Sequence, residues 1–416
     1  MKVLVISHNV FSDTQSMGKT LANYFSGFNP KDLAQFYIHN QIPTINCCND
    51  YYRITDKEVI QSIFGKSVGK SYQSDSSFFQ SIDVDTSEFS RKIYQNARKR
   101  TPLTYIARNI WWRAGHWYNK KFRCWLDRIA PDCVFFASGD YAFMYNIALK
   151  IATSRRIPLY VSCMDDYYLY NKNNNSVLGK IQHSIFMKTV RKTIDYASCI
   201  FCICEKMSMD YESFFSKKTI TIHTPSSLKE PLHEMKKNKI CYLGNLGHQR
   251  DKQLIGIGKA LKELNLSIDH IDVYSTEDRS AILSGMTIDN GIVFHGPVEA
   301  DEVKRIMGES LAVIHTESFD DTIRCTIRYS VSSKISDSLM SGTCIFAYGP
   351  DDIASIEYLQ RNYAAICCTN AEDLSKKLKQ LICDDNLRVE VQNNAIKLAN
   401  QNHMYGRTNI FDSICQ

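Results

Sequence analysis

The chain reads RYSVSSKISDSLMSGTCIFAYGP from residue 328 to residue 350. The serines, the short amphipathic run and the glycine after it predict a helix over Lys334–Ser341. The unbroken apolar run that follows predicts a buried strand over Cys344–Ala347. Lys334 and Asp337 are three residues apart and project from one face of the first helical turn. A lysine at a helix start attracts phosphate, and a carboxylate one turn later can accept hydrogen bonds from sugar hydroxyls. An ordinary Lys–Asp pair on a helix surface has the same spacing.

Short apolar runs alternate with helical patterns on both sides of this stretch, which predicts an α/β fold with parallel sheets. We expect an N-terminal domain over residues 1–225, a Pro- and Lys-containing linker over 226–238, a C-terminal domain over 239–395 and a C-terminal helix in 396–416 that packs on the first domain. Each half opens with a strand, a loop and a helix, so we predict two doubly wound, Rossmann-like domains that face a cleft. The expected strands are 3–6, 35–39, 133–137, 159–163, 199–204, 219–223, 239–243, 268–274, 292–294, 311–315, 344–347 and 365–368.

The composition excludes several classes of protein. With 416 residues, 44% of them hydrophobic and 23% charged, the chain is long and apolar enough for two or three globular domains. Its 18 glycines and 9 prolines are too few for a collagen-like or low-complexity chain. No window approaches an apolar membrane span or a secretion signal, and an odd count of 15 cysteines in so long a chain favours a reducing cytoplasm over a disulfide framework. The spacing of Cys199, Cys202 and Cys204 fits a buried strand, and we expect no metal site.

Positive charge is concentrated in residues 91–128. This segment holds 11 Lys or Arg residues and one acid, a net charge of +10, so the remainder of a chain with a total of +6 sums to −4. All four tryptophans (Trp111, Trp112, Trp117 and Trp125) lie there as well. Basic residues beside interfacial tryptophans favour an anionic membrane surface, whereas an otherwise acidic chain without a nucleic-acid module argues against nucleic acid. A structural helix pair with buried tryptophans is the alternative.

The loop after the first strand is not a phosphate-binding P-loop, because Asp13 stands where that motif needs a glycine five positions before Gly18. Gly18 still lets a ligand approach the backbone at the start of the first helix. Acceptor-binding candidates are Asp140, Asp165 and Asp166, which follow predicted strands at the edge where doubly wound folds bind ligands. Capping of the following helices is the alternative role for these three aspartates.

Residues 334–350 resemble the donor-site signature of retaining glycosyltransferases with the two-domain GT-B fold, in particular the glycosyltransferase family 4 enzymes of bacterial polysaccharide assembly. Asp337-Ser338-Leu339-Met340-Ser341-Gly342 resembles the family's acid-x-x-x-x-Gly run. Residues 241–246 with Arg250 and Lys252 resemble its Gly-Arg-Leu…Lys loop, and residues 291–298 resemble the strand and turn near the nucleobase. The chain departs from the family pattern where Tyr329 replaces the first of two glutamates, where Asn245 and Arg250 replace an arginine and a lysine, and where Met164 replaces a histidine.

The resemblance implies a cytoplasmic enzyme, peripheral on the inner face of the plasma membrane, that moves a sugar from a nucleoside diphosphate to a saccharide acceptor, on a lipid carrier, with retention and without a metal or other cofactor. It implies that Lys334 and Arg250 stabilise the leaving diphosphate. The other donor-site residues it implies are Gly18, Gly244, Lys252, Gly296, Val298, Arg328, Ser332, Ser333 and Asp337. A nucleotide-sugar epimerase of the same fold and a non-catalytic scaffold that binds nucleotide or membrane are the alternatives.

Overall fold

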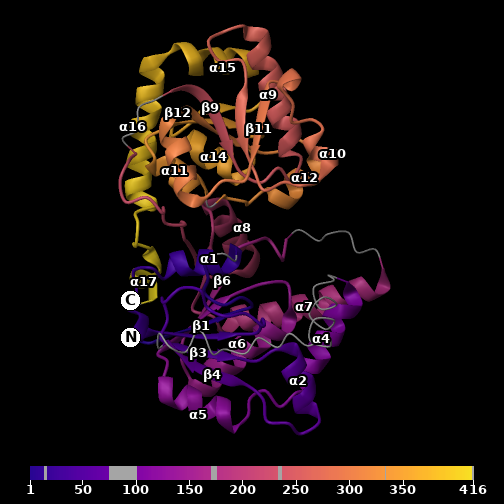
Figure 1. Cartoon of the computed structure of the whole chain (residues 1–416). Helices are drawn as coiled ribbons and strands as arrows, with labels where there is room; N and C mark the ends of the chain where they lie inside the picture. Colours follow the sequence, from indigo (N-terminus) through magenta and orange to yellow (C-terminus); the bar gives the residue numbers. More distant parts are fainter. Residues whose placement is uncertain (14–15, 75–100, 170–175, 233–236, 333, 415–416) are drawn as a thin grey trace. The chain divides into compact units, whose positions relative to one another are not determined.

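A computed structural model describes residues 1–13, 16–74, 101–169, 176–232, 237–332 and 334–414 (Figure 1). The chain forms two compact units. Unit 1 comprises Met1–Ile222 together with Thr408–Gln416, and unit 2 comprises His223–Arg407. The described chain therefore leaves unit 1 at one point and returns to it near the C-terminus.

The described residues of unit 1 form an eight-stranded sheet with the order β4-β3-β2-β1-β5-β6-β7-β8, and among these strands only the edge strand β4 is antiparallel. The strands are β1 (Val3–Ser7), β2 (Leu33–Tyr37), β3 (Asp50–Arg53), β4 (Lys70–Gln73), β5 (Cys133–Ala137), β6 (Leu159–Cys163), β7 (Cys199–Cys202) and β8 (Thr219–Thr221). The helices are α1 (Ser16–Tyr24), α2 (Asp56–Ile63), α4 (Pro102–Ala114), α5 (Lys120–Ile129), α6 (Ala142–Arg155), α7 (Val177–Tyr196), α8 (Glu205–Phe215) and the C-terminal α17 (Asn409–Ile414). The central strands are buried along their whole length, as expected for a parallel sheet covered on both faces.

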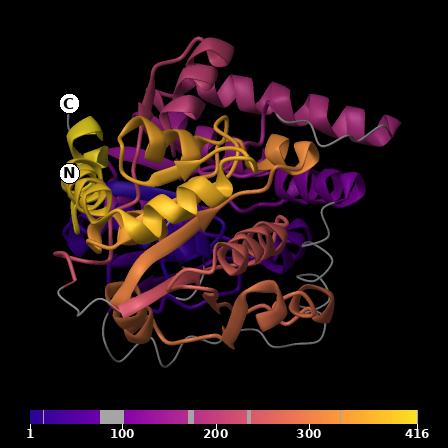
Figure 2. The same cartoon turned by 90° about the horizontal axis from the view of Figure 1, so that it is seen from above.

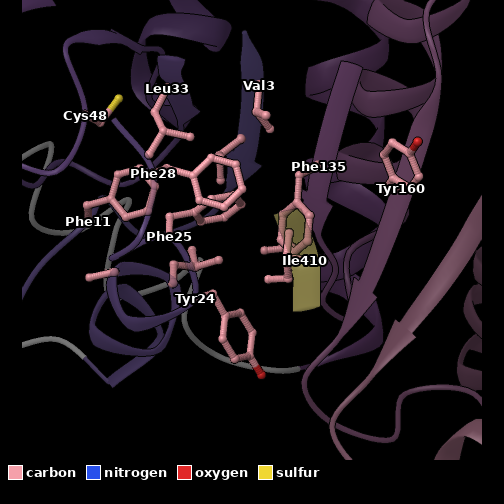
Figure 3. Packing of buried hydrophobic residues seen from close by; sticks show 14 of the residues in the cluster. Val3, Phe11, Tyr24, Phe25, Phe28, Leu33, Cys48, Phe135, Tyr160 and Ile410 are labelled. Carbon is pink, nitrogen blue, oxygen red and sulfur yellow. The ribbon is translucent and has the colours of Figure 1, made fainter. Parts of the chain in front are cut away.

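Alternating side chains of β1 and β5 divide between the two faces of this sheet. Val3 and Phe135 face a cluster with Phe25, which directly follows α1, and the Phe25 and Phe135 rings meet edge to face with centroids 5.0 Å apart (Figure 3). Ile410 of α17 belongs to the same cluster, and the Thr408 hydroxyl donates to the Tyr24 carbonyl. The end of the chain is thus part of the unit 1 core.

The tryptophans of the basic segment are mainly core residues. Trp112, Trp117 and Trp125 are 2%, 6% and 3% exposed, and they pack on aromatic rings that include Phe36 and Phe122. Trp111 is half-buried. These three buried rings cannot act as interfacial anchors, which removes the expected basis for membrane contact through them. Residues 91–100, with five of the segment's cations, lie outside the described residues.

Unit 2 is built on a six-stranded parallel sheet with the order β11-β10-β9-β12-β13-β14. The strands are β9 (Lys237–Leu243), β10 (Ile271–Tyr274), β11 (Ile292–Gly296), β12 (Ser310–Thr316), β13 (Cys344–Tyr348) and β14 (Ile366–Cys368). The helices are α9 (Arg250–Leu264), α10 (Ser280–Leu283), α11 (Ala300–Glu309), α12 (Asp321–Ile327), α13 (Lys334–Met340), α14 (Ala354–Arg361), α15 (Leu374–Cys383) and α16 (Asp385–Asn402). Apolar clusters lie on both faces of the sheet, one with α9 and α15 and others with α11, α13, α14 and α16. Figure 2 shows helices of unit 2 on both sides of its strands.

The α/β class with two doubly wound sheets, predicted from the alternating pattern, is confirmed. The pattern did not predict β3 and β4, because the tyrosine-rich stretch that forms β3 lacks a continuous apolar run. The boundaries between the two units also differ from the expected boundaries. Part of the expected linker belongs to unit 2, where Ser226 contacts α13, and residues 396–402 continue α16 rather than starting a C-terminal helix.

The described residues show two further features that bear on function. No described helix has the length and apolar content needed to cross a membrane. All 14 described cysteines are free thiols, and Cys415 lies outside the described residues. Cys199 and Cys202 are buried in β7, and the Cys204 thiol caps α8 by accepting a hydrogen bond from the Met207 amide.

Candidate functional site

Each sheet has a topological switch point, where the strand order reverses and doubly wound folds bind their ligands. In unit 1 it lies between β1 and β5, and in unit 2 it lies between β9 and β12. The carboxyl ends of β9 and β12 are Leu243 and Thr316. The residues gathered at these two strand ends are therefore the first candidates for a ligand site in unit 2.

Lys334 reaches the unit 2 switch point from the first residue of α13. Its Nζ donates a hydrogen bond to the carbonyl of Leu243, the last residue of β9, at 2.9 Å. This hydrogen bond to a backbone carbonyl orients the ammonium group at the end of β9. The structure thus places Lys334 where a phosphate bound at this switch point would need a cation.

Arg250 reaches the same edge of the sheet from the start of α9. Its Nε donates to the carbonyl of Thr316, the last residue of β12, at 3.2 Å. Its Nη2 lies 2.9 Å from both carboxylate oxygens of Glu317, which is fully buried. Among the described residues, the Arg250 Nη1 makes no hydrogen bond. Lys334 and Arg250 are thus brought to adjacent strand ends, but Glu317 already balances the charge of Arg250.

Burial dominates the electrostatics around this ion pair. It raises the pKa of Glu317, and the Arg250 guanidinium opposes the shift without cancelling it. Burial, with a contribution from Arg250, lowers the pKa of His315 to about 3. The neutral His315 ring contacts the Ser355 hydroxyl through Nε2 at 2.9 Å and lies 3.9 Å from Glu317. The pair therefore sits in an environment that disfavours any uncompensated charge.

Asp337 of α13 has a structural partner inside unit 2. Its Oδ1 accepts hydrogen bonds from the Ser226 hydroxyl at 2.8 Å and from the Ser227 amide at 2.6 Å. Unit 2 begins at His223, so the half-buried Asp337 carboxylate fixes the first residues of this unit. Both of these hydrogen bonds are accepted by one of the two carboxylate oxygens, Oδ1.

The other residues expected near the phosphates differ in their surroundings. Arg328 directly follows α12 as its C-cap, and its guanidinium lies 4.5 Å from the centre of the Tyr329 ring. The Ser332 hydroxyl accepts a hydrogen bond from the Lys334 amide at 3.3 Å, and the expected Ser333 lies outside the described residues. Lys252 is exposed on the first turn of α9.

Two of the expected glycines lie at strand ends of the unit 2 sheet. Gly244 directly follows β9, and a Cβ there would come within 2.7 Å of the Tyr242 hydroxyl. Gly296 ends β11 with a φ of 77° and has open space where a side chain would project. Val298, two residues later, packs at the edge of an apolar cluster.

A ring pair beside Gly296 was not expected from the sequence. His295 stacks on Tyr274 with ring centroids 4.5 Å apart, and its Nε2 lies 2.6 Å from a carboxylate oxygen of Asp272. His295 and Tyr274 lie on the neighbouring parallel strands β11 and β10. The side chains of such strands alternate between the two faces of the sheet, and this alternation could have predicted the ring pair. The expected nucleobase region thus has aromatic rings at its edge.

The unit 1 switch point is occupied by His8, which directly follows β1. Its buried ring lies between those of His39 and Tyr141, with centroids 5.9 and 5.5 Å away, and a Cβ on Gly139 would come within 2.8 Å of it. Gly139 follows β5, so a glycine is needed where the ring meets this strand end. Sequence reasoning missed His8, although a histidine directly after the first strand was a usable signal.

The three expected acceptor aspartates lie after β5 and β6 and have unequal surroundings. Asp140 accepts a hydrogen bond from the Tyr105 hydroxyl at 2.5 Å. Asp166 accepts bonds from the amides of Tyr168 and Leu169 and from the Tyr211 hydroxyl, so it organises its own loop. Asp165 is exposed, with its carboxylate 3.2 Å from the Tyr167 hydroxyl.

Gly18 lies in α1 against the chain's own loop. A Cβ at this position would come within 2.4 Å of the Val10 carbonyl and 3.0 Å of the Ser12 side chain. The buried Gln35 fixes this loop, because its side chain accepts from the Phe11 amide and donates to the Ser7 hydroxyl. The glycine thus permits a close approach, and the group that approaches it here is protein backbone.

Comparison with known proteins bears on the fold. No protein-family model and no curated protein matches the chain by sequence. Solved structures do match: HepE of Anabaena in complex with UDP superposes with a TM-score of 0.60 at 11% identity, covering 97% of this chain and 95% of that one. This is the GT-B fold.

Two further structures agree with this assignment over nearly whole chains. The glycosyltransferase WaaG, involved in lipopolysaccharide biosynthesis, matches with a TM-score of 0.54 at 10% identity, covering 97% of this chain and 96% of WaaG. A UDP-forming α,α-trehalose-phosphate synthase from Burkholderia xenovorans matches with a TM-score of 0.59 at 8% identity, covering 100% of both chains. The expected GT-B architecture is confirmed.

Proposed function

We propose that this GT-B protein is a glycosyltransferase that moves a sugar from a nucleoside diphosphate to a saccharide acceptor in surface polysaccharide synthesis, with retention and without a metal ion. The observation that carries the proposal is Lys334, whose ammonium is bonded to the terminal carbonyl of β9 at the unit 2 switch point. Doubly wound folds bind phosphates at such points, and a fixed cation there favours a diphosphate.

The chemistry follows from where negative charge develops. Cleavage of the bond between the sugar and the diphosphate leaves the bonding electron pair on a phosphate oxygen, and fixed cations lower the energy of that state. Lys334 supplies this charge, and the Arg250 Nη1 donates to a second phosphate oxygen while Glu317 holds the guanidinium in place. The departing phosphate oxygen takes the acceptor's proton as the acceptor oxygen bonds to the same face of the sugar.

The remaining residues bind the two substrates. Asp337 Oδ2 accepts from the ribose, and the backbone near Gly296 and Val298 meets the base. Asp140 and Asp165 bind acceptor hydroxyls, whereas Asp166, which serves its own loop, contributes through that loop. The acceptor is a saccharide on a lipid carrier, by the resemblance to enzymes of polysaccharide assembly. HepE was crystallised with UDP and with UDP-glucose, so uridine is the first base to test.

A thermal-shift screen against nucleoside diphosphates tests the donor site, because a ligand of the native state raises the melting temperature by mass action. We expect UDP or another diphosphate to stabilise the protein. Lys334→Met should abolish that shift and lower turnover by about 100-fold or more. Lys259→Met, which removes an exposed lysine of α9, is the matched control and should behave as wild type. Full turnover in Lys334→Met would overturn the assignment.

Product analysis then identifies the reaction. Incubation with donor alone should leave the sugar configuration unchanged, and adding acceptor should give a glycoside that retains the donor's anomeric configuration, also in the presence of EDTA. Conversion of the donor sugar without acceptor would identify an epimerase. Nucleotide binding without any turnover would identify a scaffold, and either result would refute the proposal.

A further inference from the structure

The hydroxyl of Tyr242 is a buried polar group of unit 2 that the proposed mechanism leaves without a role. Tyr242 belongs to β9 and is 5% exposed. Its hydroxyl donates a hydrogen bond at 2.6 Å to the carbonyl of Asn245, within the β9–α9 loop (residues 244–249). Burial raises the pKa of Tyr242 well above its usual range, so the hydroxyl keeps its proton and always donates. Strand β9 is therefore bonded to the loop that follows it.

The Tyr242 ring packs closely against Gly244, the first residue of the loop. A Cβ on Gly244 would come within 2.7 Å of the Tyr242 hydroxyl and within 2.8 Å of the ring carbon that carries it. Gly244 does not have a positive φ, so its backbone conformation does not require glycine. Glycine is needed at this position because the tyrosine occupies the space where a side chain would project.

Beyond Asn245, further hydrogen bonds of the β9–α9 loop lead to Arg250. The Asn245 side-chain oxygen accepts from the Gly247 amide, and the Gly247 carbonyl accepts from the Arg250 amide at 3.3 Å. His248 and Gln249 lie in the left-handed region, with φ of 58° and 57°. Residues other than glycine adopt this conformation where neighbouring contacts hold it. The tyrosine hydroxyl therefore starts a series of bonds that ends at the backbone of Arg250.

The β9–α9 loop joins the anchoring points of the two expected cations. Lys334 is bonded to the carbonyl of Leu243, the residue directly before the loop, and Arg250 directly follows the loop. The Arg250 guanidinium is held by Glu317 and by the Thr316 carbonyl, whereas the loop sets where the Arg250 backbone begins. The spacing of the two cations thus depends on the loop keeping one conformation.

This spacing matters to a ligand that contacts both cations at once. A diphosphate presents two phosphate groups to them, whereas a monophosphate needs only one of the two cations. We propose that Tyr242 is a positioning residue, which holds the β9–α9 loop so that Lys334 and Arg250 are spaced for a diphosphate, and thereby selects diphosphates over monophosphates. A preorganised loop favours binding because it loses little conformational freedom when the ligand arrives. The inference rests on the proposed function, since it takes the unit 2 switch point as the nucleotide site.

Calorimetric titration of the full chain with UDP and with UMP tests the proposal. GDP with GMP, or ADP with AMP, takes their place if the thermal-shift screen selects another base. Tyr242→Phe keeps the ring and removes only the hydroxyl that donates to Asn245. We expect UDP to bind about fivefold more weakly, the effect of one buried hydrogen bond, and UMP to change by less than about twofold. General damage to unit 2 would weaken both nucleotides alike.

A second variant and a measurement without ligand test the same loop. Asn245→Ala removes the side-chain oxygen that accepts from the Gly247 amide and should also weaken UDP more than UMP. Because both residues act on one loop, the double variant should lose less UDP affinity than the product of the two separate factors. Hydrogen exchange measured by mass spectrometry reports on the loop directly, and Tyr242→Phe should speed the exchange of amides in residues 244–249.

Tyr37→Phe is the matched control. Tyr37 ends β2 in unit 1, is fully buried, and donates its hydroxyl proton to the Gln41 carbonyl at 3.0 Å, so this variant removes the same kind of bond between a strand and the loop after it. It should bind UDP and UMP as wild type does. Unchanged UDP binding in Tyr242→Phe, or equal weakening of UDP and UMP, would overturn the role of Tyr242 alone. A wild-type protein that binds no nucleoside diphosphate would refute the proposed function together with this inference.

Discussion

The Arg250 guanidinium lies against the Glu317 carboxylate, with Nη2 2.9 Å from both carboxylate oxygens and Nε 3.2 Å from one of them. Glu317 directly follows β12 and is fully buried, while Arg250 starts α9. The pair therefore ties a helix start to a strand end at the unit 2 switch point. The two expected cations therefore have different partners. Arg250 binds the Glu317 carboxylate, and Lys334 donates a hydrogen bond to the Leu243 carbonyl.

Glu317→Gln should destabilise the protein, because it leaves the Arg250 charge in a buried site without its counter-charge. We expect the free energy of unfolding to fall by about 3 kcal/mol. The double variant Arg250→Met with Glu317→Leu should lose much less stability, because it removes both charges together. Urea denaturation measures both values. A Glu317→Gln variant as stable as wild type would show that the pair does not hold this edge of the sheet.

Variants at Ser226 and Asp337 distinguish a structural role of the Asp337 carboxylate from a role in ligand binding. Ser226→Ala removes only the hydroxyl that donates to Asp337 and should cost about 1 kcal/mol of stability with unchanged nucleotide affinity. Asp337→Asn should lower nucleotide affinity by about tenfold, because a charged acceptor for the ribose is lost. Calorimetric titration with the nucleotide found in the screen gives both affinities. If Asp337→Asn binds as wild type does, its carboxylate serves unit 2 alone.

Gly18→Ala should destabilise unit 1 by about 2 kcal/mol, because the new methyl group would lie 2.4 Å from the Val10 carbonyl and must displace backbone. Gly256→Ala is the matched control. Gly256 lies within α9 with open space where a side chain would project, so the alanine should be neutral or stabilising by up to about 1 kcal/mol. Thermal and urea unfolding measure both effects, and equal stability of the two variants would contradict this account of Gly18.

His223 should make the protein less stable in mild acid. Burial, aided by Arg361, lowers its pKa to about 4, against about 6.5 in an unfolded chain. Between these values the unfolded chain binds a proton that the folded chain does not, so stability falls as the pH falls, by about 1.4 kcal/mol per pH unit for this group.

His223→Gln removes this contribution, while that of His315, whose pKa is lowered to about 3, remains. The loss in free energy of unfolding between pH 6.5 and pH 4.5 should therefore be smaller in the variant than in wild type by about 2 kcal/mol. Urea denaturation at both pH values measures the difference. Identical losses in the two proteins would show that His223 titrates normally in the folded state.

The sequence by itself determined the fold class, most strands and the position of the strongest motif. Apolar runs such as 3–6, 133–137 and 344–348 form buried parallel strands, and the Ser-rich start and Gly342 bound α13 close to the expected residues. These features are local, because the hydrophobic period, the helix caps and the turns depend on residues that are close in sequence. The aspartates expected at strand ends also lie there, since the carboxyl ends of parallel strands share one edge of a sheet.

Only the tertiary structure decided which side chains meet. The partnership of Arg250 with Glu317 spans 67 residues, and that of Asp337 with Ser226 spans 111, separations at which no periodicity carries information. The same holds for the tryptophans: composition suggested a surface patch, but packing against β2, β3 and α6 buries three of the four rings. Apolar surface is left instead on α4 and α7, because whether a helix face is covered depends on what packs against it.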